Sequence, residues 1–276
     1  TREYLDKLDE PRVSLVNLTS SSGISGATNF GIEAARGDII ALMDHDDMLA
    51  KDALAHIVVA FVQQHADLVY SDETVFNDDM ESLSFGYFGS PILKPDYSPD
   101  LLLSHNYVTH FLAVRKELIE AVGGLRAEFD GAQDYDLILR LTEVTHDIVH
   151  IAEPLYHWRQ STQSTSLDTG VKPEAHLRGK KALTEALDRR NIKGKILMGN
   201  APHFFRVRRE IIGNPSVDIV IPFRDQPVML QQCIDSLLTR TRYSNFRIIG
   251  VDNGSVELLT LDLRRRYEES SSQVKF

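Results

Sequence analysis

The sequence predicts an α/β fold with a mostly parallel central sheet and helices on both faces. Patterns of buried strands at residues 39–43 and 67–71 flank a helical pattern at residues 51–65. This alternation is typical of α/β domains with a parallel sheet. The first strand runs directly into Asp44-His45-Asp46-Asp47. Because ligands of such sheets bind beyond the carboxyl ends of the strands, this acidic run predicts a functional site.

Composition indicates a globular chain and excludes several classes of protein. The 276 residues are 42% hydrophobic and carry a formal net charge of −10, whereas a general nucleic-acid binder would carry a basic stripe. We therefore predict no nucleic-acid partner. No apolar stretch approaches the ~18 residues of a transmembrane helix. The lone Cys233 excludes an internal disulfide and agrees with a reducing, cytoplasmic location.

The first residues, 1–7, contain neither Met nor the apolar core of a signal peptide. We therefore expect the chain to be a segment of a longer protein. Hydrophobic periodicity predicts the further elements of its first part. These are a strand at 12–18, a short strand and helix within 111–122, helices at 25–36, 134–144 and 173–190, and a long loop at 76–100.

The alternation of predicted strands and helices resumes at Pro215. Residues 217–222 predict a strand, residues 227–239 a helix, and residues 246–251 a strand that ends in Asp252-Asn253-Gly254-Ser255. A helix at 258–268 and the start of a strand at 274–276 follow. We therefore predict a domain at residues 1–200, a linker at 201–215 and the opening of a second domain at 216–276.

Several short motifs occur together in a fixed order along nearly the whole chain. They are Ser25-Gly26-Ala27-Thr28-Asn29-Phe30-Gly31, Leu42-Met43-Asp44-His45-Asp46-Asp47, Tyr70-Ser71-Asp72-Glu73, Lys94-Pro95-Asp96-Tyr97-Ser98-Pro99, Gly131-Ala132-Gln133-Asp134-Tyr135-Asp136, Leu155-Tyr156-His157-Trp158-Arg159, Ile219-Val220-Ile221-Pro222 and Val251-Asp252-Asn253-Gly254-Ser255. Their joint order resembles glycosyltransferase family two, and specifically the tandem-domain bacterial enzymes that build O-antigen and related surface polysaccharides. Many relatives have Arg where Thr28 stands, so we carry over no nucleotide contact from that position.

The resemblance implies a GT-A fold and an inverting transfer. A sugar would move from a nucleoside-diphosphate donor to a saccharide or lipid-linked saccharide acceptor, at the cytoplasmic face of the plasma membrane and with Mn²⁺ or Mg²⁺. The alternative is a catalytically inactive, transferase-like module that binds or scaffolds a partner. Nucleotidyl transfer is disfavoured, because residues 1–37 and 213–230 lack a Gly-rich basic loop.

The acidic run suits a divalent cation, since Mg²⁺ and Mn²⁺ prefer carboxylate oxygens and substrate phosphates. By resemblance Asp46 is the metal ligand, and Asp44 lies near the ribose or the donor sugar. Asp47 could instead be the N-cap of a helix at 48–65. The alternative is that all three residues have only structural roles, as helix caps and as polar residues that keep a loop soluble.

Inversion requires a base that takes the proton of the acceptor hydroxyl. By resemblance this base is Asp134, with Gln133 in place of the family's Glu. Asp134 would also suit the N-cap of the helix at 135–144, and the two roles are compatible. We expect Asp136 to be a surface or supporting group.

Further site residues follow from the resemblance. His157 could bind the metal and Arg159 the diphosphate, since alternate residues of a strand share a face. The alternative for His157 is packing beside Trp158. Pro222 and Asp252 are placed at the nucleotide. The basic stretch Arg206–Arg209 could touch anionic lipid headgroups in a peripheral membrane association, or it could form a solvated strand face.

In the resembling fold the first strand, first helix and second strand build the nucleotide-binding half, and we expect the chain before Thr1 to have supplied them. We expect the strand-helix-strand of residues 216–276 to complete the first sheet, either within one chain or by a swap between chains of a homo-oligomer. Asp252 would then complete a donor site together with Asp44 and Asp46. The competing expectation is a separately packed fragment.

Overall fold

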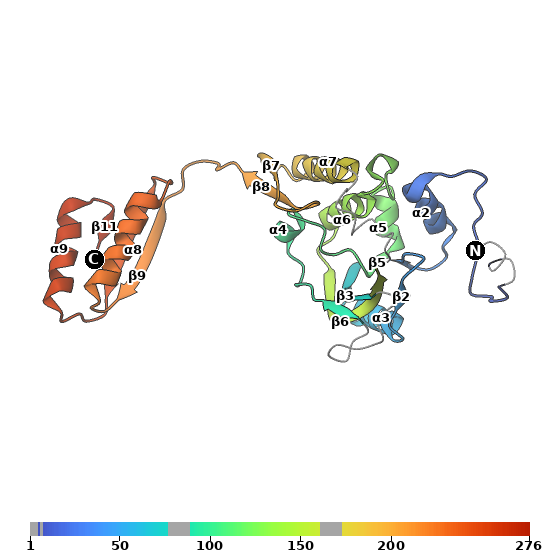
Figure 1. The fold of residues 1–276 in the computed structure, drawn as a ribbon, viewed down its shortest axis with the longest axis horizontal. Coiled ribbons are helices and arrows are strands. Elements are labelled where there is room, and N and C mark those ends of the chain that lie inside the picture. The colour runs from blue at the N-terminus through green and yellow to red at the C-terminus, as the bar shows by residue number, and fades with distance from the viewer. Residues whose placement is uncertain (1–4, 6–7, 77–88, 161–172) are drawn as a thin grey trace. The chain divides into compact units, whose positions relative to one another are not determined.

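The computed structural model describes residue 5 and residues 8–76, 89–160 and 173–276 (Figure 1). Its chain divides into two compact units, unit 1 (Thr1–Glu210) and unit 2 (Ile211–Phe276). The division falls within the predicted linker. Residues 205–209 nevertheless form a strand of unit 1, because they pair with residues 194–198.

Unit 1 is built on a six-stranded sheet with the order β1-β5-β3-β6-β2, in which β4 also pairs with β3. The strands are β1 (Ile39–Leu42), β2 (Met48–Leu49), β3 (Leu68–Phe76), β4 (Ser90–Ile92), β5 (Leu112–Arg115) and β6 (Ile148–Arg159). Among these described strands, β3 and β6 run parallel and every other pair runs antiparallel. The prediction of a mostly parallel sheet is therefore wrong for unit 1. A run of a few apolar residues predicts a buried strand, but it does not indicate whether that strand pairs parallel or antiparallel with its neighbours.

Helices cover both faces of this sheet, as predicted. They are α2 (Gly23–Ala34), α3 (Ala53–Gln63), α4 (Pro99–Leu102), α5 (Lys116–Ala121), α6 (Gln133–Val144) and α7 (Pro173–Arg189), with the short η1 (Ala127–Phe129). Successive residues of a strand point to opposite faces. Accordingly Leu68 packs in the core cluster that includes α6 and α7, whereas Val69 packs in the cluster that includes α3.

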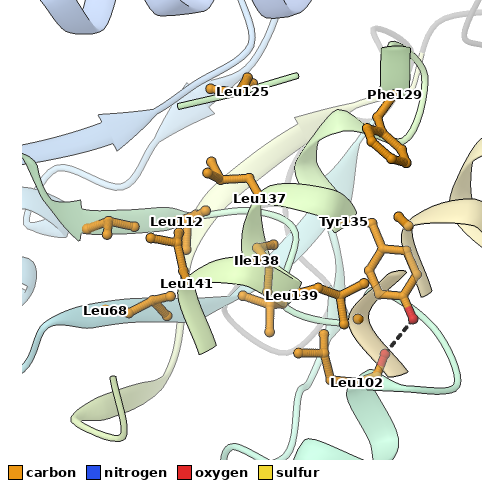
Figure 2. Packing of buried hydrophobic residues seen from close by; sticks show 14 of the residues in the cluster. Leu68, Leu102, Leu112, Leu125, Phe129, Tyr135, Leu137, Ile138, Leu139 and Leu141 are labelled. Atoms are coloured by element: carbon orange, nitrogen blue, oxygen red, sulfur yellow. Dashed lines mark hydrogen bonds between the residues drawn. The ribbon is translucent and has the colours of Figure 1, made fainter. Parts of the chain in front are cut away.

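Helix α6 lies at the centre of the larger cluster (Figure 2). Leu137, Ile138 and Leu141 are fully buried there together with Leu68 of β3. The Tyr135 hydroxyl in the first turn of α6 donates to the Leu102 carbonyl at 2.7 Å. These contacts fix the start of α6, which carries Asp134.

The strand predicted at residues 12–18 is not formed. Val13, Leu15 and Val16 are each about half exposed, and no strand pairing is found for these residues in the described part of the chain. An isolated segment with strand-like alternation has no partner for its backbone groups, so the pattern alone is insufficient. The small hairpin of β7 (Gly194–Met198) and β8 (Phe205–Arg209) completes unit 1.

Unit 2 (orange to red in Figure 1) contains the predicted strand-helix-strand and its continuation. Its elements are β9 (Val217–Phe223), α8 (Pro227–Arg240), β10 (Phe246–Asp252), α9 (Leu258–Ser270) and β11 (Val274–Lys275). The three strands form a parallel sheet of their own, in the order β11-β10-β9. Ile234 and Ile248 are fully buried in a separate core.

Among the described strands, β9 pairs with β10 inside unit 2. Helices α8 and α9 both contribute to the core of that unit. That residues 217–221 complete the sheet of residues 39–43 remains a prediction. None of the helices in the described ranges is long and apolar enough to span a membrane.

Candidate active site

A cleft of about 920 Å³ opens in unit 1 beside the end of β1. Its walls come from segments that lie far apart in the sequence. The polar residues that line it are Thr28, Asp44, Asp46, Thr109, His110, Asp130, Gln133, Asp134, Arg159, Glu174 and Arg178. Three predicted site carboxylates, those of Asp44, Asp46 and Asp134, thus meet in one cleft.

Asp47 holds the acidic loop in place. Its carboxylate is buried, where it accepts hydrogen bonds from the Tyr156 hydroxyl and, at 2.7 Å, from the Arg159 backbone N–H. The Tyr156 oxygen in turn accepts from the Asp44 backbone N–H at 3.1 Å. The N-cap alternative for Asp47 is wrong, because α3 begins only at Ala53, with Asp52 as its N-cap.

Asp44 and Asp46 are left to face the cleft. Removal of water by the surrounding protein raises the pKa of the Asp44 carboxyl above its ordinary 3.8. The neighbouring charges of Asp47, Asp46 and Asp134 act in the same direction, while His110 opposes them. The carboxylates thus create a negative electrostatic potential in the cleft. A bound cation would reduce the repulsion between them.

Asp134 lies in the first turn of α6, where its negative charge is favoured by the helix dipole. It is not the N-cap, a position that Ala132 occupies. Its Oδ2 accepts a hydrogen bond from Asn106 Nδ2 at 3.0 Å. Asp136 was predicted to be a surface or supporting group. It is fully buried, and its Oδ2 forms an ion pair with Arg140 Nη2 at 2.7 Å. Asp136 therefore supports α6 and takes no part in the cleft.

Arg159 ends β6 and lines the cleft beside the acidic loop, with its Nε donating to the Asp46 carbonyl at 2.8 Å. His157 is not among the residues that line the cleft, whereas Trp158 and Arg159 are, and its role as a metal ligand remains a prediction. Its Nδ1 is 2.8 Å from Thr74 Oγ1, and burial lowers its pKa. In the described ranges no group of three or more His, Cys, Asp or Glu side chains is placed to hold a metal.

The Ser- and Thr-rich stretch that follows Arg159 lies outside the described residues. Pro222 and Asp252 lie in unit 2, in β9 and at the end of β10. Hydrogen bonds from Ser255, first from its side chain and then from its N–H to Asp252 Oδ1 at 2.8 Å, lower the pKa of the Asp252 carboxyl. Arg264 Nη1 lies 2.5 Å from Asp252 Oδ2. All residues that line the cleft belong to unit 1. That Pro222 and Asp252 join the cleft therefore remains a prediction.

From the sequence, acceptor-side packing and a chemical role are equally plausible for His105 and His110, which flank Asn106-Tyr107. Thr109 and His110 line the cleft, and the His110 ring stacks on Tyr156 with centroids 4.9 Å apart. Asn106 reaches Asp134. The sequence signal for this segment was the run of polar side chains immediately before the apolar residues that form β5.

Comparison with known proteins places these features in a family. The profile of Glycosyl transferase family 2 matches residues 1–123 and 218–276. O-antigen biosynthesis protein RfbC of Myxococcus xanthus is 40% identical over 264 residues, which are 94% of this chain and 20% of that protein. Protein y4gI of Sinorhizobium fredii is 39% identical over 269 residues, covering 96% of this chain and 29% of the relative. The chain thus spans less than a third of the length of either relative.

The fold is shared with a solved structure. The crystal structure of S. aureus TarS 1-349 in complex with UDP-GlcNAc aligns with a TM-score of 0.51 at 15% identity, over 68% of this chain and 53% of that one. This likeness supports the predicted GT-A fold. On the family match and the identities to these relatives, the chain belongs to glycosyl transferase family 2.

Proposed function

We propose that the cleft of unit 1 is the active site of an inverting glycosyltransferase that serves bacterial surface-polysaccharide synthesis. The donor is a nucleoside-diphosphate sugar and the acceptor is a saccharide or a lipid-linked saccharide. One observation carries the proposal: Asp44 and Asp46 from the end of β1 share a single cleft with Asp134 from α6. The naming of RfbC as an O-antigen biosynthesis protein supports the class of product.

The reaction needs one displacement. The acceptor hydroxyl oxygen forms a bond to the anomeric carbon, the bond from that carbon to the diphosphate oxygen breaks, and the nucleoside diphosphate leaves with the electron pair. Asp134 takes the hydroxyl proton as general base. Attack from the face opposite the leaving group inverts the anomeric configuration.

The chemistry of the cleft fits a divalent cation that arrives with the donor. Mg²⁺ and Mn²⁺ commonly use one or two carboxylates together with substrate phosphates, so they need no three-residue protein cage. Asp46 would hold the ion and Asp44 would assist, on the exposed side of the loop that Asp47 anchors. The ion would supply charge stabilisation to the departing diphosphate. The geometry lends no support to His157 as a ligand.

We assign Arg159 to the diphosphate. Its backbone N–H and Nε are bonded to Asp47 and Asp46 respectively, which fixes the side chain beside the acidic loop. Its guanidinium also lies 4.7 Å from the centre of the Phe76 ring. A planar cation held in this way suits a phosphate oxygen better than a flexible Lys would.

We further propose that unit 2 opens a second domain of the same family and that its β9 completes the sheet of unit 1 in a second copy of the chain. β1 and β9 are both edge strands in the described sheets, and the family profile matches unit 2 separately from residues 1–123. Pro222 and Asp252 would then bind the nucleotide. A mixture of an Asp46→Asn chain and an Asp252→Ala chain, unfolded and refolded together, should regain activity that neither has alone. A monomeric mass in light scattering and no regained activity would contradict this arrangement.

A peripheral association with the cytoplasmic membrane face is a smaller proposal. Lys195 and Arg208 are paired positions of β7 and β8, and both are exposed, as is Arg206. Co-sedimentation with anionic vesicles that is lost in Arg206→Ala/Arg208→Ala would support it. Equal sedimentation of the two proteins would leave these residues as a solvated strand face.

The main proposal is tested by release of nucleoside diphosphate from a panel of UDP-, GDP- and dTDP-sugars with Mn²⁺. Asp46→Asn keeps the size of the side chain and removes its charge, so release should fall by orders of magnitude while the melting temperature is retained. Asp188→Asn is the matched control, because Asp188 is exposed on α7 outside the cleft. Full activity in Asp46→Asn, or in excess EDTA, would overturn the metal-assisted site. Absence of any nucleotide binding would favour a scaffolding module.

A further inference from the structure

Within the described ranges the side chain of Asn106 makes a single hydrogen bond, and that bond goes to Asp134, the proposed general base. Asn106 Nδ2 donates to Asp134 Oδ2 at 3.0 Å. Asn106 lies in the loop after α4, whereas Asp134 lies in α6. The contact therefore joins two segments that meet only in the folded chain.

The other polar atom of Asn106 has no partner among the described residues. Its Oδ1 is buried and makes no hydrogen bond to them, an arrangement that destabilises a folded protein. Rotating the amide by half a turn would set Oδ1 against Asp134 Oδ2, two acceptors facing each other. The fold thus tolerates an unpaired oxygen in the orientation that presents N–H to Asp134, and a buried group of this kind requires an explanation.

The segment that carries Asn106 is itself held firmly. Lys94 Nζ donates to the Val108 carbonyl at 3.1 Å and to the His110 carbonyl. The Tyr107 hydroxyl accepts from the Ser98 N–H at 2.7 Å, and Tyr107 is buried. A donor on so well anchored a segment can restrict the rotation of the carboxylate that it touches.

We propose that Asn106 is a positioning residue for Asp134. By engaging Oδ2 it fixes the plane of the carboxylate and leaves Oδ1 to receive the acceptor's proton. This inference rests on the proposed function, since it assumes that Asp134 is the base. Misplacement of a reacting group by about 1 Å can cost about 10²-fold in rate.

The test uses Asn106→Leu in the full chain. Leu nearly matches Asn in shape, removes the donor and also removes the unpaired oxygen. The kcat for nucleoside diphosphate release should fall by about 10²-fold, with the KM for the donor unchanged and the melting temperature equal or higher. A purely structural role predicts the opposite, a lower melting temperature with unchanged kcat. Asn106→Gln, which keeps the carboxamide, should recover part of the lost rate.

Thr145→Val is the matched control, because Thr145 Oγ1 also donates to an aspartate, Asp67 Oδ2 at 2.7 Å, and neither residue lines the cleft. It should lower the melting temperature and leave kcat alone. An unchanged kcat in Asn106→Leu, or a raised donor KM at constant kcat, overturns the inference. If Asp134→Asn is inactive while Asn106→Leu is fully active, this inference fails alone. If Asp134→Asn keeps full activity, the assignment of the base fails with it.

A second measurement does not need turnover. The shifts in melting temperature caused by Asn106→Leu and Asp134→Ala should be non-additive in the double variant, because the two side chains contact each other. Additive shifts would show that the contact has no energetic weight, and would overturn the inference even if no donor is turned over.

Discussion

Lys94 Nζ lies 3.1 Å from Glu73 Oε2 inside unit 1, with the two side chains only 3% and 6% exposed. The Lys94 backbone N–H also donates to Asp72 Oδ1 at 2.8 Å. Because the same ammonium binds the carbonyls of Val108 and His110, this ion pair connects β3 to the segment that lines the cleft. The ion pair therefore supports the wall of the site without belonging to it.

Breaking this ion pair should cost more than replacing it. Lys94→Met leaves a buried carboxylate alone, and loss of one partner of a buried pair typically costs about 3–5 kcal/mol. Lys94→Met/Glu73→Leu removes both charges, so it should unfold at a denaturant concentration closer to that of the unaltered chain than Lys94→Met does. Urea titrations of the variants measure this. A double variant that unfolds at a lower urea concentration than Lys94→Met would contradict the prediction.

Lys94 should make the free energy of unfolding increase with pH in the alkaline range below 10.5. Burial lowers the pKa of its ammonium below the ordinary 10.5, and the attraction of Glu73 only partly opposes this. Between the lowered pKa and 10.5 the unfolded chain binds more protons than the folded one, so stability rises with pH there and is lost as pH falls through the folded value. The difference in unfolding free energy between the unaltered chain and Lys94→Met/Glu73→Leu should grow as pH approaches 10.5. A difference that stays flat across this range would show that Lys94 is not desolvated.

The hydroxyl of Tyr156 should matter to both stability and donor binding. Tyr156 is fully buried, its hydroxyl donates to Asp47, and its oxygen accepts from the Asp44 N–H. Tyr156→Phe leaves those buried groups short of a partner, at about 1–3 kcal/mol. The melting temperature should fall by roughly 3–10 °C for a chain of this size. Calorimetry should show weaker binding of donor with Mn²⁺, because the loop that carries Asp46 loses its anchor.

Tyr135→Phe is the control for that experiment. The Tyr135 hydroxyl also donates a buried hydrogen bond, to the Leu102 carbonyl, and Tyr135 is not among the residues that line the cleft. It should lower the melting temperature without changing donor affinity. Equal affinity losses in the two variants would show that general destabilisation explains the effect.

Replacement of Asp134, the proposed base, should lower the rate of the chemical step without weakening donor binding. General-base catalysis typically contributes about 10²–10⁴-fold, so Asp134→Asn should lower kcat by that order, while the affinity for donor and Mn²⁺ stays nearly the same. Steady-state release of nucleoside diphosphate and calorimetric titration of the same protein measure the two quantities. A large loss of donor affinity with unchanged kcat would move Asp134 from the base to the donor site.

Local pattern was enough to select the candidate site residues of this chain. An apolar run followed by Asp44-His45-Asp46-Asp47 marks the end of a buried strand, since periodicity and burial are properties of a few neighbouring residues. The same reasoning located α6 and its first-turn Asp134, and the β9–α8–β10 passage. The order of motifs then identified the family, which the comparisons confirm.

Contacts between distant segments decided the remaining features. Strand direction in unit 1, the anchoring of Asp47 by Tyr156, and the Asn106–Asp134 bond all join residues whose spacing in the sequence carries no periodic signal. The same holds for β9, whose apolar pattern suits either sheet and which pairs with β10 because α8 and α9 bury a core there. A residue's neighbours along the chain set its propensity and pattern, whereas its partners across the fold depend on which buried surfaces and hydrogen-bonding groups remain to be satisfied.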